Sequence, residues 1–137
     1  MNRYIREIIW QKGRDREKVL VASIRDTDTI VGFGAWKHVV SSLPGDDQRV
    51  IRVPYFGVDA HFQGEHIESG ESCADTLYSS LEADAVSHPD SSPEMQIELF
   101  CDTENERGLR FWSRQGFQVI GTADGRSRDG QYYRMRR

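Results

Sequence analysis

The feature that most constrains the fold of this chain is a short helix pattern at residues 105–117, held between two strand patterns. Residues 95–101, MQIELFC, predict one strand, and residues 117–121 predict the next. Between them, residues 102–104 offer side chains that can cap a helix, and Gly116 is placed to end it in the left-handed conformation. A strand, a capped helix and a second strand in this order predict helices packed on a sheet.

Three strands are expected in the first half of the chain. Residues 19–25 and 29–38 flank a sequence that favours a hairpin turn. Residues 49–58 form a third apolar pattern, which Pro54 and Gly57 interrupt. Because proline cannot donate a hydrogen bond to a neighbouring strand, we expect this strand to bulge or splay there.

Helical spacing occurs twice more. Apolar residues on one face predict a helix over residues 2–12. Cys73, Leu77 and Leu81 recur every four residues and predict a helix that begins near Gly70. With a last strand at residues 131–135, the expected order is helix, three strands, helix, strand, helix and two strands.

This order predicts an α/β (α+β) fold: a single mixed, mostly antiparallel sheet flanked by helices. The length of 137 residues suits one domain, so we assign residues 1–137 to a single domain. A formal net charge of -4 gives no electrostatic reason to bind nucleic acid.

The sequence indicates neither a membrane span nor a secretory leader, because it has no long apolar stretch and no apolar signal core. The two cysteines, Cys73 and Cys101, lie in apolar patterns and are expected as buried thiols rather than as a disulfide. The expected compartment is therefore the cytoplasm.

The helix pattern and the turn that follows it resemble the GNAT superfamily of acetyl-CoA-dependent N-acetyltransferases. The residues at that family's spacing are Asn105, Gly108, Phe111, Gly116 and Phe117. The resemblance implies the acyl-CoA N-acyltransferase fold, with acetyl-CoA as co-substrate. It also implies that Asn105 faces the cofactor, with Phe111 and Trp112 nearby on the same helix.

A second resemblance lies between the interrupted strand and the helix that begins near Gly70. In the family, backbone N–H groups of a glycine-rich loop at a helix N-terminus face the pyrophosphate, where the helix dipole favours an anion. Ser72 and Ala74 stand where the family usually has glycines. The residues that the resemblance assigns to cofactor binding here are Gly57, Val58, Gln63, Gly64, Gly70, Glu71, Ser72, Cys73 and Ala74.

This loop also departs from the family pattern. About six extra residues lie between Gly64 and the helix, and Glu65, Glu68 and Glu71 add negative charge where phosphates would bind. We expect the insertion to loop away from the pyrophosphate, because a longer connection costs little entropy. The alternative is a loop that binds no cofactor.

The catalytic residues are less clearly indicated. The position of the family's usual tyrosine acid is Trp112, whose indole N–H is no acid near neutral pH and whose other role is a packed core aromatic. Tyr133 and Tyr55 are the expected substitutes, with Tyr132 and Cys101 as alternatives. Asp59 is a candidate base, and His61 and His38 are alternatives to it. The family's glutamate on the bulged strand has no counterpart here.

The sequence does not support two other kinds of site, a nucleotide-binding phosphate loop and a zinc site. Gly64 and Gly70 have neither the spacing nor the following lysine of a nucleotide-binding phosphate loop. His61, Glu65, His66 and Glu68 are clustered, but their spacing differs from that of zinc-binding helices, and we interpret them as solvated loop residues. No metal is therefore expected.

The expected function is transfer of an acetyl group from acetyl-CoA to a primary amine of a small molecule or protein. The alternative is a non-catalytic acyl-CoA-binding or interaction module on the same fold. The family begins with a strand and two helices, so a single helix at residues 2–12 implies that the first strand and first helix are lacking. An edge strand would then be exposed, and a second copy of the chain could cover it as a homodimer.

Overall fold

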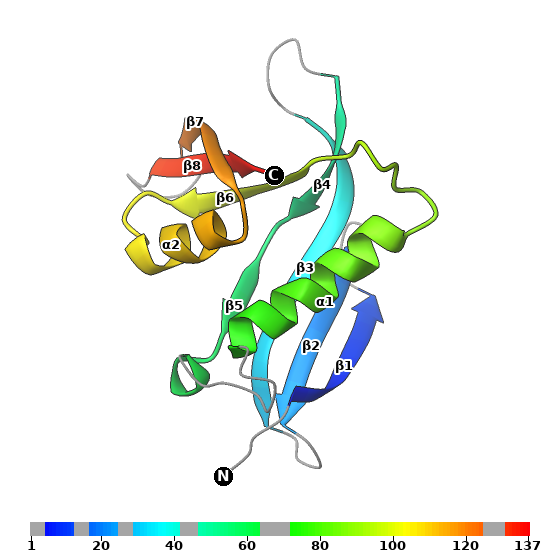
Figure 1. Ribbon diagram of the computed structural model, residues 1–137, viewed down its shortest axis with the longest axis vertical. Helices are drawn as coiled ribbons and strands as arrows, with labels where there is room; N and C mark the ends of the chain where they lie inside the picture. The colour runs from blue at the N-terminus through cyan, green and yellow to red at the C-terminus, as the bar shows by residue number, and fades with distance from the viewer. Residues whose placement is uncertain (1–4, 13–16, 25–28, 42–46, 64–71, 125–130) are drawn as a thin grey trace. The chain divides into compact units, whose positions relative to one another are not determined.

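The computed structural model is shown in Figure 1 and groups into two compact units, each built from separate segments of the chain. The residues that the structure describes are 5–12, 17–24, 29–41, 47–63, 72–124 and 131–137. The first unit comprises Met1–Lys37 and Pro54–Pro93, and the second comprises His38–Val53 and Glu94–Arg137. Among the described residues, no helix is long and apolar enough to cross a membrane.

Hydrogen bonding links the strands in the order β1-β2-β3-β4-β6-β8-β7, and β5 pairs with β3. The first unit holds β1 (Ile5–Lys12), β2 (Lys18–Ile24), most of β3 (Ile30–Val40), β5 (Phe56–Val58), the 3-10 turn η2 (Ala60–Phe62) and α1 (Cys73–Ser87). The second holds the end of β3, β4 (Arg49–Val53), β6 (Ile97–Asp102), α2 (Glu106–Arg114), β7 (Gln118–Asp124) and β8 (Gln131–Arg136). The strands β4 and β6 are parallel, whereas β1–β2, β2–β3, β3–β5, β6–β8 and β7–β8 are antiparallel. The predicted mixed, mostly antiparallel sheet with helices is confirmed.

In the first unit, α1 lies against one face of the strands (Figure 1). A Cβ atom added at Gly34 would lie 2.8 Å from Leu81 Cδ1, and one at Gly32 would lie 3.0 Å from Leu77 Cδ2. Both leucines are fully buried, as their four-residue spacing predicted. The two glycines therefore let the helix approach the strands closely.

The prediction of a helix over residues 2–12 is wrong. Residues 5–12 form β1, which pairs with β2 along its length in the antiparallel direction. A short apolar run fits helical and extended spacing about equally well, and its β-branched isoleucines favour a strand when a partner strand is available. A strand therefore comes first in the sheet order, and no α-helix is described before α1.

The predicted interruption of the strand at residues 49–58 is confirmed. Strand β4 ends at Val53 and β5 begins at Phe56, so that Pro54 lies in the break. Before the break, Val53 pairs with Leu99 of β6. After it, Gly57 pairs with Phe33 of β3. Both strands therefore neighbour β3, and only β4, before the break, is also paired with β6.

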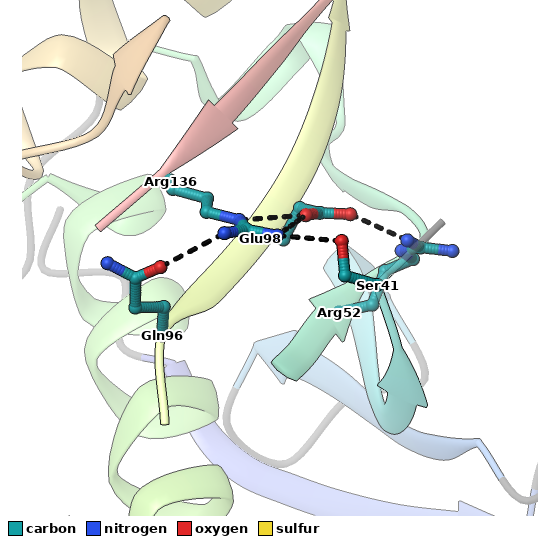
Figure 2. A network of polar contacts seen from close by, with 5 residues as sticks. All are labelled: Ser41, Arg52, Gln96, Glu98 and Arg136. Carbon is teal, nitrogen blue, oxygen red and sulfur yellow. Dashed lines mark hydrogen bonds and ion pairs between the residues drawn. The ribbon is translucent and has the colours of Figure 1, made fainter. Parts of the chain in front are cut away.

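The second unit contains a buried row of charges across three neighbouring strands (Figure 2). Glu98 of β6 is fully buried and lies in register with Arg52 of β4 and Arg136 of β8. Arg52 Nη2 lies 2.6 Å from Glu98 Oε1, and Arg136 Nε lies 2.9 Å from Oε2. Arg136 also donates to Ser41 Oγ and Gln96 Oε1. These contacts replace the water that the carboxylate loses on burial.

We predict that Glu98→Gln lowers the free energy of unfolding by about 3 kcal/mol, because it leaves two partly buried guanidinium groups without their counter-charge. Urea unfolding followed by circular dichroism measures the change. Glu94→Gln, at an exposed position just before β6, is the matched control and should have little effect. Equal stability of the two variants would contradict the structural role of Glu98.

Candidate functional site

The outer edge of β5 is the first part of the candidate site. Ala35 N donates to Tyr55 O and Asp59 N donates to Val31 O, so odd-numbered residues of this segment direct their backbone groups toward β3. By strand alternation, the N–H of Val58 points away from β3. Among the described strands β5 pairs only with β3, so its other edge has no strand partner. Gly57 and Val58, both predicted cofactor residues, lie on this strand.

The turn after β5 is ordered by its own side chains. Asp59 caps η2, and its Oδ1 accepts a hydrogen bond from His61 N at 2.9 Å and lies 2.8 Å from His61 Nδ1. Gln63 Nε2 donates to Val58 O at 3.1 Å. The backbone N–H of His61, and then its ring, hold the pKa of Asp59 below its ordinary value. A lowered pKa makes this predicted base a weaker one.

Helix α1 begins after Ser72, which caps its N-terminus. Ser72 Oγ accepts a hydrogen bond from Asp75 N at 3.1 Å and donates to Asp75 Oδ2 at 2.7 Å. Cys73 is buried and Ala74 is half-buried in the first turn. The helix dipole favours an anion here, whereas the carboxylate of Asp75 opposes one. The predicted residues Ser72, Cys73 and Ala74 are thus brought together.

Tyr55 lies in the break between β4 and β5, with 37% of its surface exposed. Its hydroxyl donates to Glu17 Oε2 at 3.3 Å, and its ring lies 5.8 Å from that of Phe33. Burial first, and then the negative charge and hydrogen bond of Glu17, raise the pKa of Tyr55. The phenol therefore keeps its proton at neutral pH, which suits a hydrogen-bond donor.

The sequence patterns did not indicate Glu17 as a site residue. It precedes β2 by one residue within a run of charges, and nothing in that run distinguishes it from solvated neighbours. Its side chain is only 13% exposed in the structure. The missed signal is non-local, because Glu17 and Tyr55 are 38 residues apart in sequence.

In the second unit, Asn105 is the N-cap of α2. Its Oδ1 accepts a hydrogen bond from Gly108 N at 3.0 Å. A Cβ atom at Gly108 would clash with the Asn105 side chain, so this cap geometry needs glycine three residues on. The sequence placed the capping side chains at residues 102–104, one position too early. The cap itself accounts for this asparagine–glycine spacing.

Trp112 is a packed aromatic residue of the second unit. It is 7% exposed, and its ring meets those of Phe111 and Phe117 at 4.8 and 5.4 Å. This burial supports the role of a packed core aromatic for Trp112. Gly116 has φ +95°, and the N–H of Phe117 donates to Trp112 O, which ends the helix as predicted.

Tyr133 lies on β8, where it pairs with Cys101 of β6 and Thr122 of β7 and is half-buried. Burial, and then the charge of Asp102, raise the pKa of the Cys101 thiol. Both cysteines are buried thiols that form no disulfide, as expected from the sequence. Tyr133 belongs to the second unit, whereas Tyr55 and Asp59 belong to the first.

Part of the predicted site lies outside the described residues. The predicted cofactor residues there are Gly64, Gly70 and Glu71, and the neighbouring charged residues are Glu65, His66 and Glu68. Within the described part of the chain, no group of three or more histidine, cysteine or acidic side chains could hold a metal ion.

We predict that Asn105→Ala lowers the free energy of unfolding by about 1 kcal/mol, because an N–H of the first turn of α2 loses its acceptor. Asn105→Asp keeps an acceptor oxygen and adds favourable charge at the helix N-terminus, so it should be close to wild type. Denaturant unfolding compares the two variants. Equal losses from both would show that the amide does more than cap the helix.

The pKa of Asp59 can be tested by carboxyl NMR. We predict that His61→Ala raises it only part of the way to the ordinary value, because the stronger donor, the backbone N–H, remains. A lowered folded pKa means that the stabilisation is present above the unfolded pKa and is lost as pH falls through the folded value. His88→Ala is the control and should leave Asp59 unchanged.

Neither a protein-family model nor a curated protein sequence matches this chain. Solved structures do match it. NAA60 of Arabidopsis thaliana in complex with acetyl-CoA is 13% identical, with a TM-score of 0.69 over 88% of this chain and 75% of that chain. Spermidine/spermine N-acetyltransferase SpeG of Vibrio cholerae is 14% identical, with a TM-score of 0.61 over 90% of this chain and 66% of that one.

A Bordetella pertussis protein assigned to the GNAT family of acetyltransferases matches in the same way. It is 12% identical, with a TM-score of 0.62 over 90% of this chain and 66% of that chain. Sequence identities this low establish a shared backbone fold but not a shared chemistry of the site. The chain therefore has the fold of the GNAT acetyltransferases, as the helix and turn at residues 105–117 implied.

Proposed function

We propose that this chain is an N-acetyltransferase that moves an acetyl group from acetyl-CoA to a primary amine of a small molecule or protein. The fold supports the proposal, because NAA60, which binds acetyl-CoA, and SpeG, a spermidine/spermine N-acetyltransferase, share it. The observation in this chain that carries it is the break at Pro54, after which β5 has one edge without a strand partner.

The residues at this edge fit acetyl-CoA. The N–H of Val58 is directed away from β3, where it can pair with an amide of the pantetheine arm as a neighbouring strand would. The helix dipole at the N-terminus of α1, with Cys73 and Ala74 in its first turn, favours the pyrophosphate, whereas the carboxylate of Asp75 opposes it. In the second unit, considered by itself, Asn105, Phe111 and Trp112 stay predicted cofactor contacts.

The transfer forms a bond from the amine nitrogen to the acetyl carbon and breaks the carbon–sulfur bond. The amine loses a proton and the leaving sulfur gains one. Tyr55 and Tyr133 are the proposed proton donors, although the raised pKa of Tyr55 makes its phenol a weaker acid. Asp59 is the weakest of the three assignments, because its pKa is lowered.

Two further parts of the proposal concern the compartment and the oligomeric state of the protein. A cytoplasmic location is supported by two buried cysteines that form no disulfide. A homodimer is supported by the position of β1 at one end of the strand order, where a second copy could pair with its edge.

Acetyl-CoA binding and transfer test the function. We predict a calorimetric heat on titration with acetyl-CoA and release of CoA thiol in the presence of a primary amine. Val58→Pro should weaken acetyl-CoA binding roughly tenfold, because it removes one N–H from the outer edge without removing a bond to β3. Val58→Ala is the matched control, since it shortens the side chain and keeps that N–H.

The outcomes are separable. Binding without thiol release over an amine panel supports the non-catalytic acyl-CoA module instead. No binding at millimolar acetyl-CoA by a folded protein would reject both. Equal binding by the proline and alanine variants, with circular dichroism spectra like wild type, would show that β5 does not hold the cofactor.

A further inference from the structure

The face of the first unit opposite α1 carries exposed aromatic rings. From Gly32 onward, even-numbered positions of β3 face α1, since Cβ atoms at Gly32 and Gly34 would touch Leu77 and Leu81. Phe33 and Lys37 therefore point to the other face. A Cβ atom at Gly57 would lie 3.8 Å from the Phe33 ring, so Gly57 faces the same side as Phe33. Tyr55, two residues earlier, faces that side too.

Phe33 and Tyr55 form the apolar part of this face. Phe33 is 47% exposed and Tyr55 is 37% exposed, and their ring centroids are 5.8 Å apart with planes tilted by 55°. Neither ring is used to pack α1, so both remain available to a ligand. The faces of such rings attract an ammonium group placed within about 6 Å.

Glu17 supplies the charge of the same cluster. Its carboxylate is 13% exposed, yet it accepts one hydrogen bond from the described residues, the 3.3 Å bond from the Tyr55 hydroxyl to Oε2. Its other oxygen, Oε1, lies 3.8 Å from Lys37 Nζ, beyond hydrogen-bond distance. A carboxylate offers about four lone-pair positions, so most of the acceptor capacity of Glu17 is unused by the described chain.

We propose that Glu17, Tyr55 and Phe33 form a recognition site for an alkylammonium group, and that the acceptors of the transfer reaction carry such a group besides the reacting amine. The acceptor role rests on the proposed function, whereas the ammonium site rests on the cluster itself. Glu17 is a specificity residue that binds the charged end of the acceptor. The two rings cover the alkyl chain of the acceptor and exclude water from the ion pair.

Lys37 gives this proposal a distinctive consequence. Its ammonium lies 3.8 Å from Glu17 Oε1 and competes with a ligand for the same oxygen. Removing the charge of Lys37 should therefore strengthen binding of a cationic acceptor, whereas removing the charge of Glu17 should weaken it. A purely structural ion pair would give losses in both variants.

The experiment compares two acceptors of equal length, 1,4-diaminobutane and 4-amino-1-butanol, which differ in one terminal charge. The measured quantity is the ratio of kcat/KM for the diamine to that for the amino alcohol. We predict that Glu17→Gln lowers this ratio roughly fivefold and that Lys37→Gln raises it. Glu94→Gln, an exposed carboxylate of the second unit, should leave the ratio unchanged.

Calorimetric titration of 1,4-diaminobutane into the protein without acetyl-CoA separates this inference from the proposed function. If acetyl-CoA does not bind but the diamine binds with an affinity that falls in Glu17→Gln, the ammonium site is upheld and the transferase is rejected. If acetyl-CoA is turned over and the ratio is the same in all variants, the ammonium site is overturned. Should Glu17→Gln fail to fold, the direction of the Lys37→Gln effect decides.

Discussion

The arrangement of strands depends on a missing hydrogen-bond donor at Pro54. Without that N–H, the segment from Arg49 to Val58 cannot remain paired as one strand, and it divides into β4 and β5. Strand β4 lies between β3 and β6 and pairs in parallel with β6, whereas β5 pairs only with β3 among the described strands. The same break leaves β5 with an edge that no described strand occupies, and this edge is the basis of the proposed cofactor site.

A second constraint is electrostatic. Glu98 is fully buried between Arg52 and Arg136, and the three residues lie in register on adjacent strands. A one-residue slip of either neighbouring strand would move its guanidinium to the opposite face. The buried charges therefore specify strand register more than they add stability, since desolvation offsets much of their attraction.

The candidate site shows how local and tertiary roles overlap. Asn105 and Gly108 have a complete local explanation as the cap of α2, and Trp112 has one as a packed ring beside Phe117. The resemblance at residues 105–117 therefore supports the fold more directly than it supports catalysis. Tyr55 differs, because its exposed ring and its bond to Glu17 serve no evident packing need.

The sequence by itself determined the features that depend on near neighbours. The stripe of α1, the left-handed Gly116 and the break at Pro54 follow from spacing and backbone chemistry, and all three are found. Only the tertiary structure decided that residues 5–12 form β1, because a short apolar run takes the conformation of its partner strand. It also decided the pairing of Glu17 with Tyr55 and of Glu98 with its arginines, since contacts 38 or more residues apart have no local signal.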